Sequence, residues 1–153
     1  MGVFKDEQGN TPLLDCVKEA EAKIYATEDT KAYSAIEGFS SFNDAVLPLI
    51  LVLSTRLSHP GALPPYTQGG SGALRVGSDF LYKLSASKII WVSDPTWVNH
   101  INIFETAGLQ VKRYPYFDRA TNGLTFDTMM SALKDIPSGD TVLFHGCCHN
   151  PPG

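Results

Sequence analysis

Two histidines, two cysteines and an amide lie together in the stretch "HGCCHNPPG" (145–153). Zinc ligands need spacings that let them converge, and His145, Cys147, Cys148 and His149 are too crowded for all four to face one ion. A disulfide between the adjacent cysteines would require a strained ring. A thiol nucleophile with a histidine base is a further hypothesis, but no oxyanion arrangement accompanies it. The bond from Asn150 to the next proline is a candidate cis bond, which would fix the direction of the amide.

The stretch "GGSGALR" (69–75) combines small residues with a hydroxyl at the start of an expected helix. Free backbone N–H groups and the positive end of the helix dipole favour a phosphate there, and Ser71 adds a hydroxyl donor. The pattern is neither a Walker loop nor a dinucleotide fingerprint, since no Gly-Lys-Ser/Thr follows and no strand immediately precedes it. The competing interpretation is a plain glycine-rich turn with Ser71 as the helix cap.

The stretch "SDPTWVNH" (93–100) places Trp97 just beyond the end of an expected strand. An indole in that position can form a flat wall for an aromatic ring, although a core tryptophan is the alternative. His100 lies one helical turn further on. It is either a supporting residue of such a site or a polar side chain satisfied by its neighbours.

The remaining pattern indicates which elements position these residues. A first helix is expected with Thr11 as N-cap and Pro12 at its first position, and Leu13, Val17, Ala20 and Ile24 form its apolar face. A second helix is expected over 39–57, with Pro48 kinking or breaking it. After a Gly/Pro-rich loop over 59–72, we expect helices from 73, over 98–107 and over 125–133, and strands over 88–93, 109–117 and 141–145.

Strands that alternate with helices across short connections predict an α/β fold with a parallel sheet built from βαβ units. In open parallel sheets, ligands bind beyond the carboxyl ends of the strands. That rule selects Asp94–Trp97, after the first strand, and Gly146–Gly153, after the last. The most unusual residues of the chain thus follow its strands.

Composition excludes several classes of protein. The 153 residues are 43% hydrophobic and 18% charged, which is typical of a globular domain. A net charge of −4 leaves no basic field for nucleic acid or an anionic membrane. The sequence shows no secretory signal, and its longest apolar run, Ala45–Leu53, is too short to span a bilayer. Three cysteines make a poor disulfide framework, so we expect a cytoplasmic protein.

Four stretches in order, "GVFKDEQGNTPLLDCVKEAE", "GGSGALRVGSDFL", "WVSDPTWVNH" and "HGCCHNPPG", resemble the aspartate and aromatic-amino-acid aminotransferases of the fold-type-I pyridoxal-phosphate enzymes. The resemblance implies that 11–153 form part of the large, pyridoxal-phosphate-binding domain, truncated at its C-terminus. It places 1–10 at the boundary with the N-terminal or small domain. Pyridoxal 5'-phosphate as cofactor, an amino acid (aspartate or aromatic) and a 2-oxo acid as substrates, and a homodimer are implied as well.

The resemblance also implies roles for individual residues. Gly70 and Ser71 match the turn that holds the cofactor phosphate, and Tyr33 matches a tyrosine that reaches the phosphate of the neighbouring subunit. Trp97 matches the indole stacked on the pyridine ring, and Asn150 matches the amide bonded to the phenolic oxygen. The remaining matches are Gly2, which lines the substrate pocket with Trp97 and Asn150; His100 and His145, which support the residues touching the cofactor; and Cys147 and Cys148, which are structural.

Two positions depart from the family pattern: Pro152 replaces a threonine and Asp94 replaces an asparagine. None of the lysines matches the family's Schiff-base lysine, so no catalytic residue is assigned, and we expect little or no turnover from these residues alone. The chain is accordingly expected to be a fragment of an aminotransferase. The alternatives are a non-catalytic module that binds pyridoxal phosphate or another phosphate ligand, and a Cys/His redox or metal protein.

Overall fold

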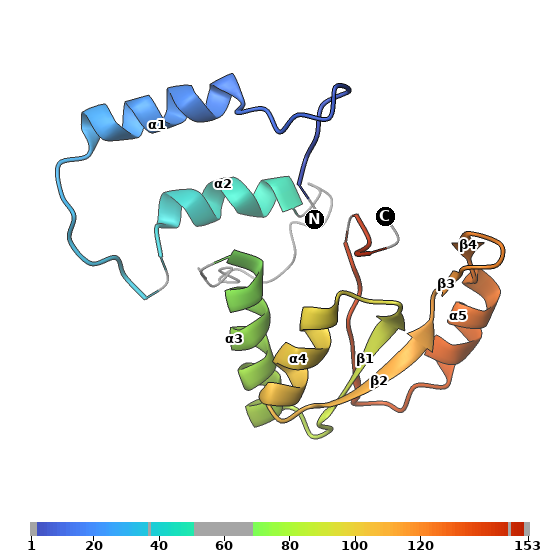
Figure 1. The fold of residues 1–153 in the computed structure, drawn as a ribbon. Coiled ribbons are helices and arrows are strands. Elements are labelled where there is room, and N and C mark those ends of the chain that lie inside the picture. The colour runs from blue at the N-terminus through green and yellow to red at the C-terminus, as the bar shows by residue number, and fades with distance from the viewer. Residues whose placement is uncertain (1–2, 37, 51–68, 147, 152–153) are drawn as a thin grey trace. The chain divides into compact units, whose positions relative to one another are not determined.

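A computed structural model describes residues 3–36, 38–50, 69–146 and 148–151. The chain divides into two compact units, Met1–Ile36 and Glu37–Gly153 (Figure 1). Within the described residues, no helix is both long enough and apolar enough to cross a membrane. The boundary expected at residue 10 concerns the family's domains and stays a prediction.

The first unit contains one helix, α1 (Asp15–Thr27), which begins later than the sequence predicts. Leu14 is its N-cap in an extended conformation, so the expectation of Thr11 as cap and Pro12 at the first helical position is wrong. The Val17 and Lys18 N–H groups donate to the Leu14 carbonyl, so the first turn of the helix closes on Leu14 and Thr11 lies before it. No residue of α1 is buried, so no packing within this unit compensates for a weak start.

The second unit carries the parallel sheet that the alternating pattern predicts. Its helices are α2 (Ser40–Ile50), α3 (Gly69–Leu84), α4 (Val98–Thr106) and α5 (Phe126–Lys134). Its parallel strands are β1 (Ile89–Asp94), β2 (Gln110–Pro115) and β5 (Thr141–Val142). A short antiparallel pair, β3 (Phe117–Asp118) and β4 (Gly123–Leu124), leads into α5. The α/β class and the parallel sheet are therefore confirmed.

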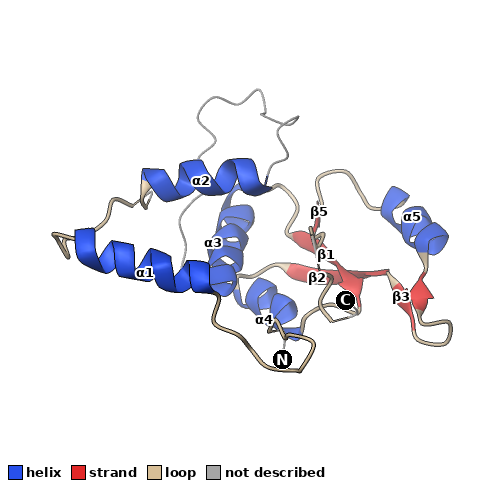
Figure 2. Cartoon of the chain, turned by 90° about the horizontal axis from the view of Figure 1, so that it is seen from above, coloured by secondary structure: helices blue, strands red, loops and turns tan. Residues whose placement is uncertain are grey.

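The strand order β2-β1-β5 puts β1 in the centre of the sheet. The chain leaves β1 toward β2 on one side and returns to β5 on the other, and both partners run parallel to β1. Right-handed crossovers in opposite directions place their helices on opposite faces. Figure 2 shows this arrangement, with α3 and α4 on one side of the strands and α5 on the other. The strand order reverses between β1 and β5, which is where doubly wound sheets bind ligands.

The core lies between the sheet and the α3–α4 face. Ile90 and Val92 point from β1 toward Phe104 of α4, and Leu109 closes the cluster at the start of β2. Alternation along β1 accounts for this, since Ile90 and Val92 share one face of the strand. Gly108 ends α4 with φ +92°, a left-handed conformation that favours glycine and turns the chain back into the sheet.

The amino-terminal edge of the sheet is tied by one carboxylate. Asp140 accepts hydrogen bonds from the Ser87 hydroxyl at 2.5 Å and the Trp91 indole N–H at 2.8 Å. These bonds, with that of Ser87 the first cause, lower the pKa of Asp140. The side chains at this edge hold the sheet together. The residues that the sequence suggests for ligand binding lie at the opposite, carboxyl-terminal edge.

Three further expectations need correction. Helix α3 begins at Gly69, so the loop expected over 59–72 is wrong for 69–72, and its other residues lie outside the described ones. The last strand covers only Thr141–Val142, not 141–145. These two residues pair with β1, and the Leu143 N–H donates the last bond of the ladder to the Trp91 carbonyl. The expected strand 109–117 is split, and a hairpin follows in which Asn122 adopts φ 51°. Of the helix expected over 39–57, α2 (Ser40–Ile50) is described and includes Pro48, and 51–57 lie outside the described residues.

Candidate functional site

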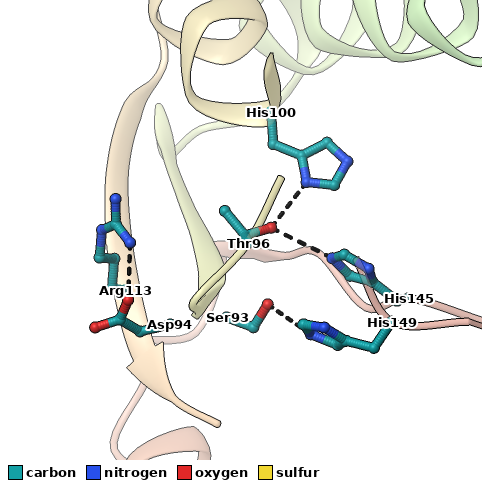
Figure 3. Close-up of polar contacts among 7 residues, drawn as sticks. All are labelled: Ser93, Asp94, Thr96, His100, Arg113, His145 and His149. Atoms are coloured by element: carbon teal, nitrogen blue, oxygen red, sulfur yellow. Dashed lines mark hydrogen bonds and ion pairs between the residues drawn. The ribbon is translucent and has the colours of Figure 1, made fainter. Parts of the chain in front are cut away.

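The segments that follow β1 and β5 meet through a threonine hydroxyl. Thr96 Oγ1 lies 2.8 Å from His100 Nδ1 on α4 and 3.3 Å from His145 Nε2, beyond β5 (Figure 3). The His100 and His145 rings meet edge to face with centroids 5.2 Å apart. Trp97, the N-cap of α4, also meets the His100 ring in a T-shaped arrangement, with ring centroids 5.3 Å apart. The two segments selected from the sequence therefore share one site.

The direction of the hydrogen bonds follows from a single backbone donor. The Asn150 N–H donates to His145 Nδ1 at 3.1 Å, so that nitrogen carries no proton. In the neutral ring the proton is then on Nε2, which donates to Thr96 Oγ1. The hydroxyl in turn donates to His100 Nδ1, and His100 carries its proton on Nε2. A directed chain thus links the backbone of Asn150 to His100.

A second histidine beyond β5 is sandwiched between two rings. His149 stacks on Tyr116 at 3.8 Å and on His145 at 3.9 Å, with interplanar angles of 9° and 10°. Its Nε2 lies 2.9 Å from Oγ of Ser93, a fully buried residue of β1 (Figure 3). The stack joins the tail to the end of β2 as well as to β1.

The histidines of the site are held neutral near pH 7. Burial lowers the pKa of His145, and burial followed by the charge of His145 lowers the pKa of His100. The pKa of His149 is lowered by burial first, and then by the charges of His145 and His100. A proton on any one ring would repel a proton on the next across distances of 4 to 5 Å. The site therefore adds no positive charge at neutral pH.

The aspartate that departs from the family pattern is paired. Arg113 Nη1 donates to Asp94 Oδ1 at 2.9 Å, across the last register pairs of β1 and β2 (Figure 3). Both side chains are about half exposed, so the pair contributes little to stability. Its consequence is electrostatic: the carboxylate at the end of β1 is offset by a guanidinium.

Helix α3 presents its N-terminus at the same edge of the sheet. It runs antiparallel to β1, to which a short connection joins it, and it packs against α4 (Figure 1). Its first turn is Gly69-Gly70-Ser71-Gly72, and an added Cβ at Gly70 would meet nothing within 4 Å. Ser71 is exposed. The first N–H groups of a helix have no intrahelical acceptor, so those of Gly70 and Ser71 offer donors to an anion.

The predicted residues separate into three groups. Trp97, His100 and His145 are brought together by contact, and Asn150 joins them through its backbone N–H. Gly70 and Ser71 share the same edge of the sheet without a contact to that cluster in the described residues. Tyr33 is fully exposed within the first unit, and Gly2 and Cys147 lie outside the described residues.

The tail shows the cis bond suggested by the sequence. The Asn150-Pro151 peptide is cis, and so is Asp94-Pro95. Cys148 is a free, exposed thiol. Among residues 3–36, 38–50, 69–146 and 148–151, no group of three or more His, Cys, Asp or Glu side chains is arranged to hold a metal ion.

Sequence reasoning missed the residues that connect the cluster. Thr96 precedes His100 by four residues and was available as a local hydrogen-bond partner, which is a signal that spacing alone provides. Ser93 and Tyr116 carried no such signal, because their roles depend on which strands are neighbours. His149 entered only as a candidate base or ligand, and its stacking depends on the conformation of the tail.

The chemistry available here is that of a planar, phosphate-bearing ligand. A half-buried indole offers a ring face, an exposed amide at Asn150 offers a donor and an acceptor, and the first turn of α3 offers N–H donors. The neutral histidines neither attract nor repel a charged group. The donor set fits pyridoxal phosphate, whose ring, oxygen substituent and phosphate need these three kinds of partner.

Comparison with known proteins points the same way. A family model described as aminotransferase class I and II matches residues 1–153. The chain is 44% identical to aspartate aminotransferase of Escherichia coli (strain K12) and 44% identical to tyrosine aminotransferase of Klebsiella pneumoniae; each match covers 100% of this chain and 39% of the relative. A solved aromatic-amino-acid aminotransferase from Burkholderia pseudomallei, covalently bound to pyridoxal phosphate, has a TM-score of 0.86 at 37% identity, covering 99% of this chain and 38% of that one.

Proposed function

The chain belongs to the class I and II aminotransferase family, and from that membership we propose that it binds pyridoxal phosphate at the carboxyl edge of its sheet. The chain spans about 39% of the length of the relatives it matches. We propose that the whole protein transfers an amino group between an amino acid, aspartate or aromatic, and a 2-oxo acid. The observation that carries the proposal is the meeting of Trp97, His145 and Asn150 where the strand order reverses.

We assign a role toward the cofactor to each residue of the proposed site. We assign the cofactor phosphate to Gly70 and Ser71 and the ring face to Trp97. Asn150 would bond the ring's oxygen substituent. His100 and His145 hold Trp97 and Asn150 in place through the contacts described above. When bound, pyridoxal phosphate supplies an electron sink for a negative charge that develops at the substrate's α-carbon.

Two assignments rest on the resemblance alone. Tyr33 would reach the phosphate of a neighbouring subunit, which presupposes a homodimer. Gly2 would line the substrate pocket together with Trp97 and Asn150. A homodimer and a cytoplasmic location are part of the same proposal, and sedimentation of the purified protein tests the first of them.

The lysines of the second unit favour binding without covalent attachment. Lys83 and Lys134 lie in the last turns of α3 and α5, and Lys88 precedes β1, so all three lie at the amino-terminal edge of the sheet. Lys88 donates to the carbonyls of Tyr82 and Ser85. The Lys112 ammonium lies over the Trp91 ring, in the middle of the strands. We therefore propose that these residues alone hold the cofactor reversibly and have little or no turnover.

Titration of the purified 153-residue chain with pyridoxal phosphate tests the proposal. The readouts are the cofactor's absorbance and the mass of the chain after borohydride reduction. We expect saturable binding that is weakened by Ser71→Ala and Trp97→Ala, with no specific reduced adduct. Val76→Ala on the exposed side of α3 serves as a control that leaves binding unchanged. A trapped adduct at one lysine would refute reversible binding, and absence of saturation would refute the cofactor site.

A further inference from the structure

His149 is held on three sides by residues from three segments. Its Nε2 bonds the hydroxyl of Ser93, which is 0% exposed and belongs to the central strand. One ring face lies on Tyr116 at 3.8 Å and the other on His145 at 3.9 Å. Figure 3 shows the ring of His149 beneath that of His145, with its edge toward Ser93. The proposed role of the Asn150 amide does not by itself require that His149 be held in this way.

Among the described residues, the segment that carries His149 makes no ladder pairing with a strand. Pairing between β1 and β5 ends at Trp91 and Val142, and the Leu143 N–H to Trp91 carbonyl bond at 2.8 Å is the last ladder contact. Beyond Leu143, the described hydrogen bonds of the tail are those of His145 and His149. The path of the backbone into Asn150 is therefore set by side chains.

The two histidines fix different atoms of that path. His145 accepts from the backbone N–H of Asn150, which sets where the residue begins. The ring contacts of His149 fix the position and tilt of its own backbone, which leads directly into Asn150. No hydrogen bond among the described residues uses the Asn150 side-chain amide, which is exposed and remains available to a ligand. A small rotation of the backbone at His149 would swing this amide away from the site.

The surroundings of His149 favour its neutral ring. Its Nδ1 is buried without a hydrogen-bond partner among the described residues, so a proton there would have no acceptor. A charged ring would also face His145 at stacking distance. The groups that surround it, namely Ser93, Tyr116 and His145, include no acid that would stabilise the charged form.

We propose that His149 is a positioning residue that directs the Asn150 amide toward the ring's oxygen substituent. The proposal rests on the cofactor site proposed above. His149 itself touches no reacting atom; it acts by holding the backbone that carries Asn150.

Coupling between the two positions tests the proposal in the full 153-residue chain. Pyridoxal phosphate affinity is measured by absorbance for the wild type, His149→Ala, Asn150→Ala and the double variant. Each single change should weaken binding roughly threefold to tenfold, the value of one hydrogen bond. The double variant should bind no more weakly than Asn150→Ala alone, since His149 acts through that amide. Independent losses that multiply in the double variant would overturn the proposal.

A conservative variant and a control separate positioning from general stability. His149→Phe keeps both stacked faces and loses Nε2, so its affinity should lie between those of the wild type and His149→Ala. Phe126→Ala removes an exposed aromatic ring on α5 and should leave affinity unchanged. If His149→Phe binds as weakly as His149→Ala, the stacked faces do not position the amide and the proposal fails.

A measurement without cofactor keeps the two proposals distinguishable. Exchange of the Asn150 backbone amide with solvent, followed by NMR, should be roughly fivefold faster in His149→Ala, because the bond to His145 is weakened. An unchanged exchange rate overturns the role of His149 whether or not the cofactor binds. Absence of binding in the wild type, with faster exchange in the variant, would instead refute the cofactor site and leave the positioning intact.

Discussion

Replacement of Thr96 by valine should destabilise the chain by removing the hydroxyl that joins two histidines. The substitution preserves shape and β-branching and deletes one oxygen. Thr96 Oγ1 lies 2.8 Å from His100 Nδ1 and 3.3 Å from His145 Nε2. His100 is only 8% exposed, so its Nδ1 would lose its partner in a place where water has little access.

The magnitude follows from which of the two bonds is left unsatisfied. A buried acceptor without a partner costs about 1–3 kcal/mol, and the longer bond to the half-buried His145 adds the low end of an ordinary hydrogen bond. We therefore expect a loss of about 2 kcal/mol in the free energy of unfolding. For a chain of this size that corresponds to a fall in Tm of about 4–8 °C. The urea midpoint should fall by about 1 M.

Urea unfolding followed by tryptophan fluorescence measures this loss, with Thr96→Ser as the matched variant. Serine keeps the hydroxyl and lacks only the methyl group, so Thr96→Ser should lower the free energy of unfolding by less than about 1 kcal/mol. Two results would refute the reasoning. One is a Thr96→Val stability within about 0.5 kcal/mol of the wild type, the ordinary range for surface changes. The other is a Thr96→Ser variant as unstable as Thr96→Val.

The remaining predictions concern pH and a turn. Burial is the main cause that lowers the pKa values of His100, His145 and His149 from 6.5. As the pH falls below 6.5, the unfolded chain therefore binds more protons than the folded chain. The free energy of unfolding should be nearly constant between about pH 7 and 9 and fall as the pH drops below 6.5; equal urea midpoints at pH 7.5 and 5.5 would contradict this. The aspartates with lowered pKa values titrate below 3.8 and do not act in this window. Gly108→Ala should cost about 1–2 kcal/mol, because φ is +92° and the new Cβ would lie 2.8 Å from the Tyr82 ring. Its urea midpoint relative to the wild type checks this, and an unchanged midpoint would show that the turn tolerates a side chain.

The fold could be predicted because local signals and the global arrangement agree. Ile89–Asp94 is β-branched, aromatic and bounded by a proline, and the helix that follows ends at a glycine with positive φ. Parallel pairing follows from the intervening helix. Boundaries were predicted less well where a tertiary contact decides them. The last strand is shorter than its apolar run, because pairing with β1, not composition, sets where it ends.

The sequence predicted the residues proposed to face the ligand, but it did not predict the residues that hold them in place. Trp97, Asn150 and His145 stand out by type and by resemblance, and contacts bring them together. In the sequence, Ser93 and Tyr116 are ordinary residues of predicted strands, with nothing to mark them as part of a site. Their contacts with His149 exist only because β1 is central and the tail folds back over the ends of β1 and β2. Such roles cannot be read from residue type and require the strand order.

Asp94 shows how a register changes the meaning of a residue. Considered alone, a carboxylate in place of an asparagine adds a negative charge at the edge of the sheet where the cofactor is proposed to bind. In the sheet, Asp94 is paired in register with Pro115 and Arg113 with Val92, so the two side chains lie diagonally across neighbouring strands. The arginine reaches the carboxylate at 2.9 Å. The charge that the departure introduces is thus offset by a second residue nineteen positions away. Because Arg113 offsets the charge of Asp94, Arg113→Gln should weaken pyridoxal phosphate binding, measured by absorbance titration, and Asp94→Asn in the same chain should restore it.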